Sequence, residues 1–131
     1  MGAVKYGEGR AKTGKNPRRY KDHIALGDTK IGAWTYFHSN GQKSRQTNYK
    51  DGKRDGLETH WSENGQKRKE ANYKDDILIR TTEFYENGQK KEEINYKDGK
   101  KDGLLTWWYE NGQKKVEANH KDGEPDGPTI L

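Results

Sequence analysis

Residues 56–75 read Gly56-Leu-Glu-Thr-His-Trp61-Ser-Glu-Asn64-Gly65-Gln-Lys67-Arg-Lys-Glu-Ala71-Asn-Tyr73-Lys-Asp75. Leu57, Thr59 and Trp61 alternate with polar residues, a period of two that is typical of a β-strand. Asn and Gly both tolerate positive φ, so Asn-Gly between two strand-like segments favours a β-hairpin. Glycines recur too often in the chain for a long helix. The stretch therefore predicts one antiparallel hairpin.

The same pattern recurs along the chain. Asn-Gly-Gln-Lys occurs four times, at spacings of 24, 23 and 24 residues, and each copy is followed eight residues later by Asn-Tyr/His-Lys-Asp; the copies begin at Asn40, Asn64, Asn87 and Asn111. The third unit departs from the pattern: Asp75-Asp76-Ile77-Leu78-Ile79 replaces a glycine-rich connection and is one residue shorter. A fixed period of this length is the signature of a repeat architecture.

Composition sets the thickness of the fold. The chain has 131 residues, of which 27% are hydrophobic, and its mean hydropathy is -1.51. That is too little apolar surface for a thick closed core, whereas repeated hairpins bury their faces against their neighbours. We predict an all-β fold, a single elongated twisted antiparallel sheet of about four tandem hairpins, over residues 31–131. Pro125-Asp-Gly-Pro128 should end the array, because proline cannot donate to a strand ladder.

The net charge is confined to the first part of the chain. The formal charge is +5, and residues 1–30 hold eight basic and three acidic residues, so residues 31–131 are neutral overall. We interpret residues 1–30 as a basic leader and degenerate N-terminal cap, with Arg18-Arg19-Tyr20-Lys21-Asp22 as a candidate capping strand. A neutral array argues against nucleic-acid binding by the repeats, because phosphate neutralisation dominates that affinity.

Turn length determines which side chains share a face. A three-residue loop, Glu63-Asn64-Gly65 with a left-handed glycine, pairs Trp61 with Lys67. We expect it to place Leu57, Thr59, Trp61, Ala71 and Tyr73 on one face. The equivalent repeated ladder, expected to serve packing between hairpins, is Phe37, Trp61, Phe84 and Trp108 with Tyr49, Tyr73, Tyr96 and His120.

The units Gly56–Asp75 and Gly103–Asp122 resemble the type-two MORN-variant repeat. This is the Gly-x-x-Thr-x-Trp/Tyr-x-x-Asn-Gly-Gln pattern of proteins labelled YwqK-family antitoxins. The resemblance covers roughly residues 31–127 and implies consecutive antiparallel hairpins in one elongated, twisted sheet. It also implies a role as a protein-interaction platform, a membrane-associated scaffold or an antitoxin.

The opposite face varies between units, and varied aromatic residues are candidate contacts. Exposed Trp and Tyr are favoured binding anchors. The alternative is that these side chains cover a small second core or pack on residues 1–30. The candidate partner-binding residues are Trp34, Tyr36, Tyr85, Trp107 and Tyr109. Lys43, Lys67, Lys90 and Lys114 recur at the turns, where we expect Glu63, Glu86 and Glu110 to cancel most of their field.

Catalytic and metal-binding motifs fail on inspection. Residues 9–16 nearly match a P-loop, but Asn16 stands where the motif needs Ser or Thr. The four histidines occupy non-equivalent positions, and there is no cysteine. We therefore expect no enzyme, no cofactor and no metal site. The given chain has no apolar stretch that reads as a signal peptide or a membrane span, which favours a cytoplasmic location.

The leading hypothesis is a non-catalytic protein-interaction or scaffold module, with antitoxin-like neutralisation of a partner as one version. Another protein is the favoured partner. Peripheral binding to an anionic membrane through the leader and the turn lysines is the alternative, and nucleic-acid binding by the leader is the second alternative. Edge strands also permit a homo-oligomer through strand pairing.

Overall fold

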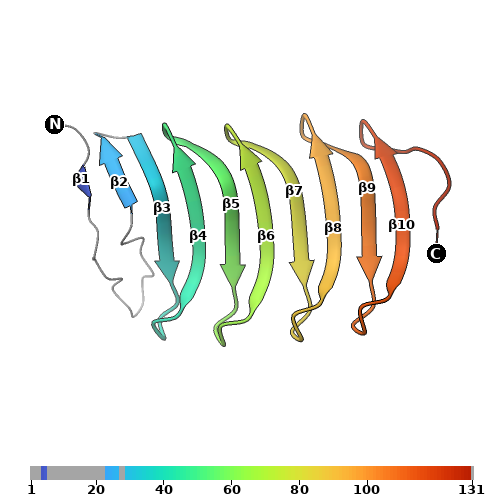
Figure 1. Cartoon of the computed structure of the whole chain (residues 1–131), viewed down its shortest axis with the longest axis horizontal. Coiled ribbons are helices and arrows are strands. Elements are labelled where there is room, and N and C mark those ends of the chain that lie inside the picture. Colours follow the sequence, from blue (N-terminus) through green and yellow to red (C-terminus); the bar gives the residue numbers. More distant parts are fainter. Residues whose placement is uncertain (1–3, 6–22, 27–28, 131) are drawn as a thin grey trace.

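The computed structural model describes residues 4–5, 23–26 and 29–130, with side chains from residue 30 (Figure 1). They form one antiparallel sheet of 11 strands, whose order in space follows the order in the chain. No helix occurs in these residues. The predicted all-β, single-sheet hairpin array is therefore confirmed. The strands are β1 Val4–Lys5, β2 His23–Leu26, β3 Thr29–Phe37, β4 Lys43–Lys50, β5 Lys53–Trp61, β6 Lys67–Lys74, β7 Ile77–Phe84, β8 Lys90–Lys97, β9 Lys100–Trp108, β10 Lys114–Lys121 and β11 Glu124–Pro125.

The Asn-Gly turns close as predicted. The Ser62 N–H donates to the Gln66 carbonyl at 2.8 Å, which closes a three-residue loop around Asn64, and Trp61 pairs with Lys67. Gly65 has φ +91°, the left-handed conformation that this turn requires of its last residue. The Asn64 side chain accepts the Gln66 N–H at 3.0 Å, as Asn side chains do in turns.

A β-bulge follows each of these turns and corrects the predicted faces. His60 pairs with Lys69 while Trp61 pairs with Lys67, so Arg68 is an extra residue on β6. One inserted residue reverses the orientation of every side chain after it. Ala71 and Tyr73 therefore lie on the face opposite Trp61, and the prediction that they share its face is wrong. The same correction applies to Tyr49, Tyr96 and His120, which follow equivalent bulges in β4, β8 and β10.

The most buried row runs across the middle of one face, which we call the Trp34 face. In strand order from β3 to β10 its cross-strand partners are Trp34, Thr47, Glu58, Ala71, Thr81, Ile94, Leu105 and Ala118. All of these except Thr81 are buried. The other face, which we call the Trp61 face, has buried threonines in its central row: Thr35, Thr59, Thr82 and Thr106. A single-layer sheet thus buries small and apolar side chains in central rows, because no second layer covers it.

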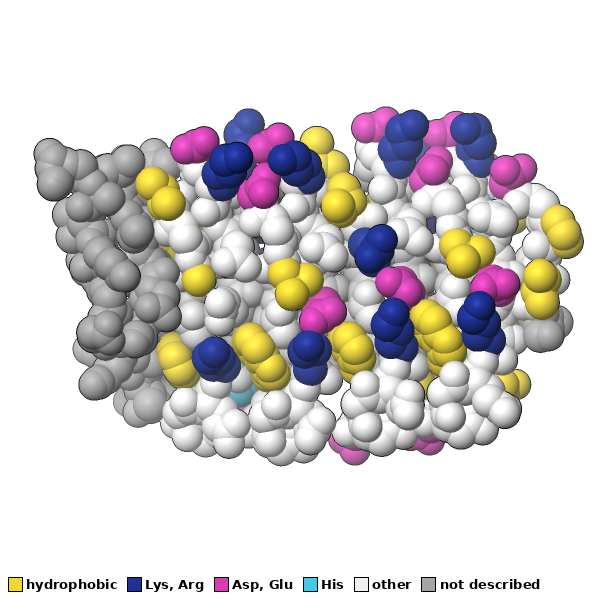
Figure 2. Space-filling model, in the orientation of Figure 1, with side chains coloured by type: hydrophobic (Ala, Val, Ile, Leu, Met, Phe, Trp, Pro, Cys, Tyr) yellow, Lys and Arg dark blue, Asp and Glu magenta, His cyan; other side chains and the backbone are white. Residues whose placement is uncertain are grey.

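A ladder of alternating aromatic rings and lysines crosses the Trp61 face, as Figure 2 shows. Lys43, Lys67 and Lys90 each place Nζ 5.5–5.6 Å from the ring centroid of the next hairpin, on Trp61, Phe84 and Trp108 respectively. Lys67 also forms an ion pair with Glu70 at 2.8 Å. Equivalent ion pairs join Lys90 to Glu93 at 3.4 Å and Lys114 to Glu117 at 2.9 Å. The cation–π contacts therefore connect neighbouring hairpins, whereas each ion pair lies within one strand. The acids that neutralise these lysines are not the predicted turn residues Glu63, Glu86 and Glu110.

Side-chain bonds join the Asn-Gly turns in two pairs. His38 Nε2 contacts the Trp61 carbonyl at 2.9 Å, and the Tyr85 hydroxyl donates to the Trp108 carbonyl at 2.6 Å. Asn40 and Asn87 likewise donate to a carbonyl in the following turn. Among the described residues, no such bond joins the second turn to the third, because the equivalent residue is the short Ser62, which turns back onto Asn64. Figure 2 shows the resulting gap between the two pairs of turns, which we call the seam.

The Asp turns at the other edge are two-residue hairpins with positive φ at both positions. Three of them use Asp-Gly, and the third repeat uses Asp75 (φ 48°) and Asp76 (φ 72°). Asp76 is held by Arg54, whose backbone N–H and Nε both lie 3.0 Å from Asp76 Oδ1. The third unit is one residue shorter than the others. After this turn, one unpaired residue, Ile79, interrupts the register between β6 and β7.

The two ends of the array extend beyond the four hairpins. β2 pairs with β3, and β3 begins at Thr29, inside the segment predicted as leader. At the other end β11 pairs with β10, and Glu117 and Ile130 exchange two backbone hydrogen bonds of 2.7 Å. The residues around Pro125 and Pro128 thus lie along the last strand in short paired stretches. The candidate capping strand, residues 18–22, lies outside the described residues.

Candidate binding surfaces

The five predicted contact residues lie on or beside the Trp34 face, but they do not form one patch. Trp34 is only 4% exposed and packs edge-on against Tyr49, with ring centroids 6.2 Å apart. Lys30 Nζ lies 4.9 Å from both ring centroids. Trp34 therefore belongs to the buried row and is not an available anchor. Tyr36 is half-buried and lies in a groove of β3–β6, far along the strand order from the other three.

Tyr85, Trp107 and Tyr109 gather near the C-terminal end of the Trp34 face, and we call them the aromatic patch. Trp107 is 40% exposed and Tyr109 is 50% exposed. Trp107 Nε1 donates to Glu92 at 2.7 Å, which orients the indole. Lys91 and Lys115 lie over the rings of Tyr85 and Tyr109, at 5.7 and 5.6 Å. Tyr85 and Trp107 line a shallow cavity of about 230 Å³. Such a hollow beside exposed rings suits an apolar side chain of a partner.

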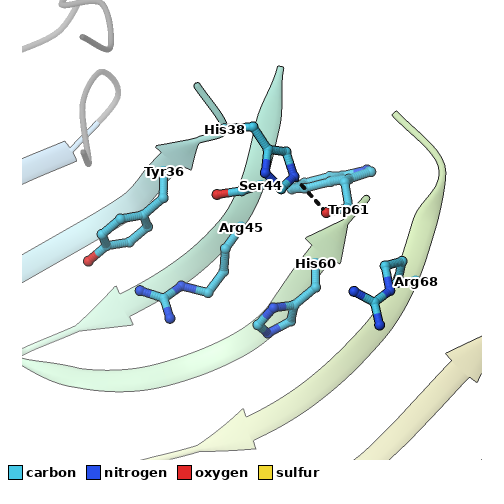
Figure 3. Close-up of a pocket in the computed structure, with 7 residues that line it drawn as sticks. All are labelled: Tyr36, His38, Ser44, Arg45, His60, Trp61 and Arg68. Carbon is cyan, nitrogen blue, oxygen red and sulfur yellow. Dashed lines mark hydrogen bonds between the residues drawn. The ribbon is translucent and has the colours of Figure 1, made fainter. Parts of the chain in front are cut away.

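A second hollow lies on the same side of the sheet in the first two repeats, and sequence reasoning missed it. It has a volume of about 370 Å³. We call it the arginine groove (Figure 3), and its lining residues are Tyr36, His38, Ser44, Arg45, His60, Trp61 and Arg68. These residues come from four strands, β3 to β6, and one turn. Their proximity depends on the strand register and the bulges, so no local motif could reveal it.

Glu58 is a carboxylate in the buried row beneath the arginine groove. It accepts hydrogen bonds from Thr47 Oγ1 at 3.1 Å and contacts His60 Nε2 at 2.7 Å. The hydrogen bond with His60 is the main reason that the pKa of Glu58 lies below its ordinary value of 4.5, and the bond with Thr47 and the charge of Arg45 act in the same direction. Burial opposes them.

This lowered pKa makes an acid-dependent stability prediction. The unfolded chain binds the Glu58 proton at a higher pH than the folded chain, so the contribution of Glu58 is present above pH about 4.5 and is lost as the pH falls through the folded value. Chemical denaturation between pH 7 and pH 3 should show a steeper loss of unfolding free energy for the native chain than for Glu58→Gln. Equal slopes for both proteins would contradict the assignment.

Other sequence motifs gain no support as sites. The P-loop-like residues 9–16 lie outside the described residues. Within residues 30–130, no three His, Cys, Asp or Glu side chains gather in a way that could hold a metal ion. In the part of the chain that the structure describes, no helix is long and apolar enough to cross a membrane.

These features define the class of protein: a tandem β-hairpin repeat protein whose single-layer sheet presents side chains on both faces. The family model of the MORN repeat variant matches residues 30–51, 54–75, 80–98 and 101–122, which together are more than half of the chain. The chain belongs to the MORN repeat variant family. Such repeats are generally associated with protein or membrane binding. No curated protein and no solved structure matches the chain.

Proposed function

We propose that the chain is a non-catalytic protein-interaction module that binds its partner through the aromatic patch. The observation that carries this proposal is the exposure of Trp107 and Tyr109 beside the cavity lined by Tyr85. Exposed aromatic side chains next to a hollow are the usual anchors of protein interfaces. Antitoxin-like neutralisation of a partner would be one form of this function.

Comparison between the repeats supports a role other than packing. The positions equivalent to Trp107 are Tyr36, His60 and Glu83, so the sheet does not need an aromatic ring there. The same position carries a polar or charged residue in two of the four units. Exposed aromatic area that the fold does not require favours a contact surface.

The turn lysines support a protein partner over an anionic membrane. Three of them are paired with Glu70, Glu93 and Glu117, and three lie over aromatic rings. Their charge is therefore largely balanced within the sheet itself. A contact through aromatic rings should also depend weakly on salt, whereas binding to anionic lipid falls steeply with ionic strength.

Affinity capture from source-cell lysate tests the proposal. We expect the intact chain to retain a protein partner. Trp107→Ala/Tyr109→Ala should retain at least about tenfold less of that partner, because such anchors contribute most of the binding energy. Leu104→Ala/Ile130→Ala, at two other exposed apolar positions, is the matched control and should retain the partner. Equal retention by all three proteins, or retention of lipid alone, would overturn the proposal.

A further inference from the structure

The arginine groove contains two arginines whose charge no acid in its lining balances. Arg45, Arg68, His38 and His60 line it, and no acid is among its lining residues. Figure 3 shows Arg45, His60 and Arg68 side by side on successive strands β4, β5 and β6. The positions equivalent to Arg45 are Lys69, Glu92 and Val116, so the repeat itself does not demand a guanidinium there.

A ring contact holds the Arg45 guanidinium in place, whereas the Arg68 side chain is exposed. The Arg45 guanidinium carbon lies 4.2 Å from the centroid of the Tyr36 ring, which fixes its plane. Its Nε is buried, and it has no hydrogen-bond partner among the described residues. Neither arginine forms an ion pair with an acid described in residues 30–130. A buried N–H without an acceptor destabilises the folded state, unless a ligand or a water molecule in the adjoining hollow accepts its hydrogen bond.

From this arrangement we infer that the arginine groove binds a phosphate monoester, carried by a phosphorylated side chain of a partner protein. Guanidinium groups donate two parallel hydrogen bonds to phosphate oxygens, and the Ser44 hydroxyl can add a further donor at the same hollow. The assignment of the phosphate to a protein rests on the proposed function; the recognition of the phosphate itself does not.

The charges along the same row favour a discrete phosphate over a flat anionic membrane. His60 pairs with Lys69, Lys69 with Glu83 and Glu83 with Glu92 across the strands. Two carboxylates therefore lie next to the positive region on the same face. A flat anionic membrane that reached the arginines would also meet these carboxylates and be repelled by them. Glu58, beneath His60, also neutralises part of the positive field locally. A phosphate monoester is small enough to contact the arginines in the hollow without approaching the carboxylates.

The test uses inorganic phosphate, a phosphoserine peptide, the same peptide without phosphate, and vesicles containing anionic phospholipid. We expect saturable phosphate binding in NMR titrations, with shifts of the Arg45 and Arg68 side-chain N–H signals. The phosphopeptide should bind at least about tenfold more tightly than its unphosphorylated form. Arg45→Gln/Arg68→Gln should weaken the binding of inorganic phosphate and of the phosphopeptide by at least about tenfold. Lys50→Gln/Lys97→Gln removes the same charge at exposed positions on the far edge and should leave both unchanged.

The outcomes separate this inference from the proposed function. An equal loss of phosphate affinity in both double variants, or the absence of saturable phosphate binding, overturns the assignment of the groove as a phosphate site. Tighter binding of vesicles than of the phosphopeptide overturns the protein source of the phosphate. Capture of a partner by Arg45→Gln/Arg68→Gln at native strength overturns the groove's role in that complex while the aromatic patch stands. Because Arg45 packs on Tyr36, Arg68→Gln alone, at an exposed position, keeps the test decisive if the double variant unfolds.

Discussion

Ile94→Asp should unfold the third hairpin, with a loss of at least about 3 kcal/mol of unfolding free energy, because it places an unpaired charge in the central row. Lys91 is the extra residue between two register pairs, Phe84 with Lys90 and Glu83 with Glu92. This bulge turns Ile94 into the central row, where it is only 8% exposed.

The control is the same substitution at an exposed isoleucine. Ile77 is 51% exposed, so we expect Ile77→Asp to change the free energy of unfolding by less than about 1 kcal/mol. Chemical denaturation followed by far-UV circular dichroism compares the two proteins. If Ile94→Asp is as mild as Ile77→Asp, the bulge does not turn Ile94 into a buried row.

Trp34→Ala should cost about 3 kcal/mol, the lower part of the range for a buried tryptophan. The substitution empties the start of the central row and removes the contacts of the indole ring with Tyr49 and Lys30. Since each hairpin contacts only its neighbours, hydrogen exchange should accelerate most in β3 and β4 and least in β9 and β10.

Trp107→Ala is the matched control for this prediction. It removes the same residue type from the same face, but from a side chain that is 40% exposed. We expect a change below about 1 kcal/mol. A loss for Trp107→Ala as large as that for Trp34→Ala would show that burial in the central row does not determine stability.

The fold was predictable because its signals are local. Asn-Gly turn chemistry, the alternation of Leu57, Thr59 and Trp61, and the repeat period each act within a few residues, and they all favour hairpins. The faces were not predictable from turn length alone, because the bulge at Arg68 lies one residue beyond the last pair that the turn determines. One signal was present: Ala71, Ile94 and Ala118 occupy equivalent positions, and all three are apolar.

The candidate site was predictable only in part. Varied aromatic residues indicated Tyr85, Trp107 and Tyr109, since the comparison between repeats needs no knowledge of register. It failed for Trp34, whose exposure depends on which row is central. The arginine groove depends on the pairing of four strands, β3 to β6, so its residues gave no signal in the sequence.

The seam between the second and third Asn-Gly turns gives the ribbon a mechanical weak line. The turns on either side are tied in pairs by His38 and Tyr85, while Ser62 ties only its own loop. The strands β6 and β7 remain paired near these turns, where Lys69 pairs with Glu83. We therefore expect the two halves of the array to bend against each other most easily at this turn edge. Such compliance would let the aromatic patch and the arginine groove, which lie in different halves, adjust their separation to one ligand.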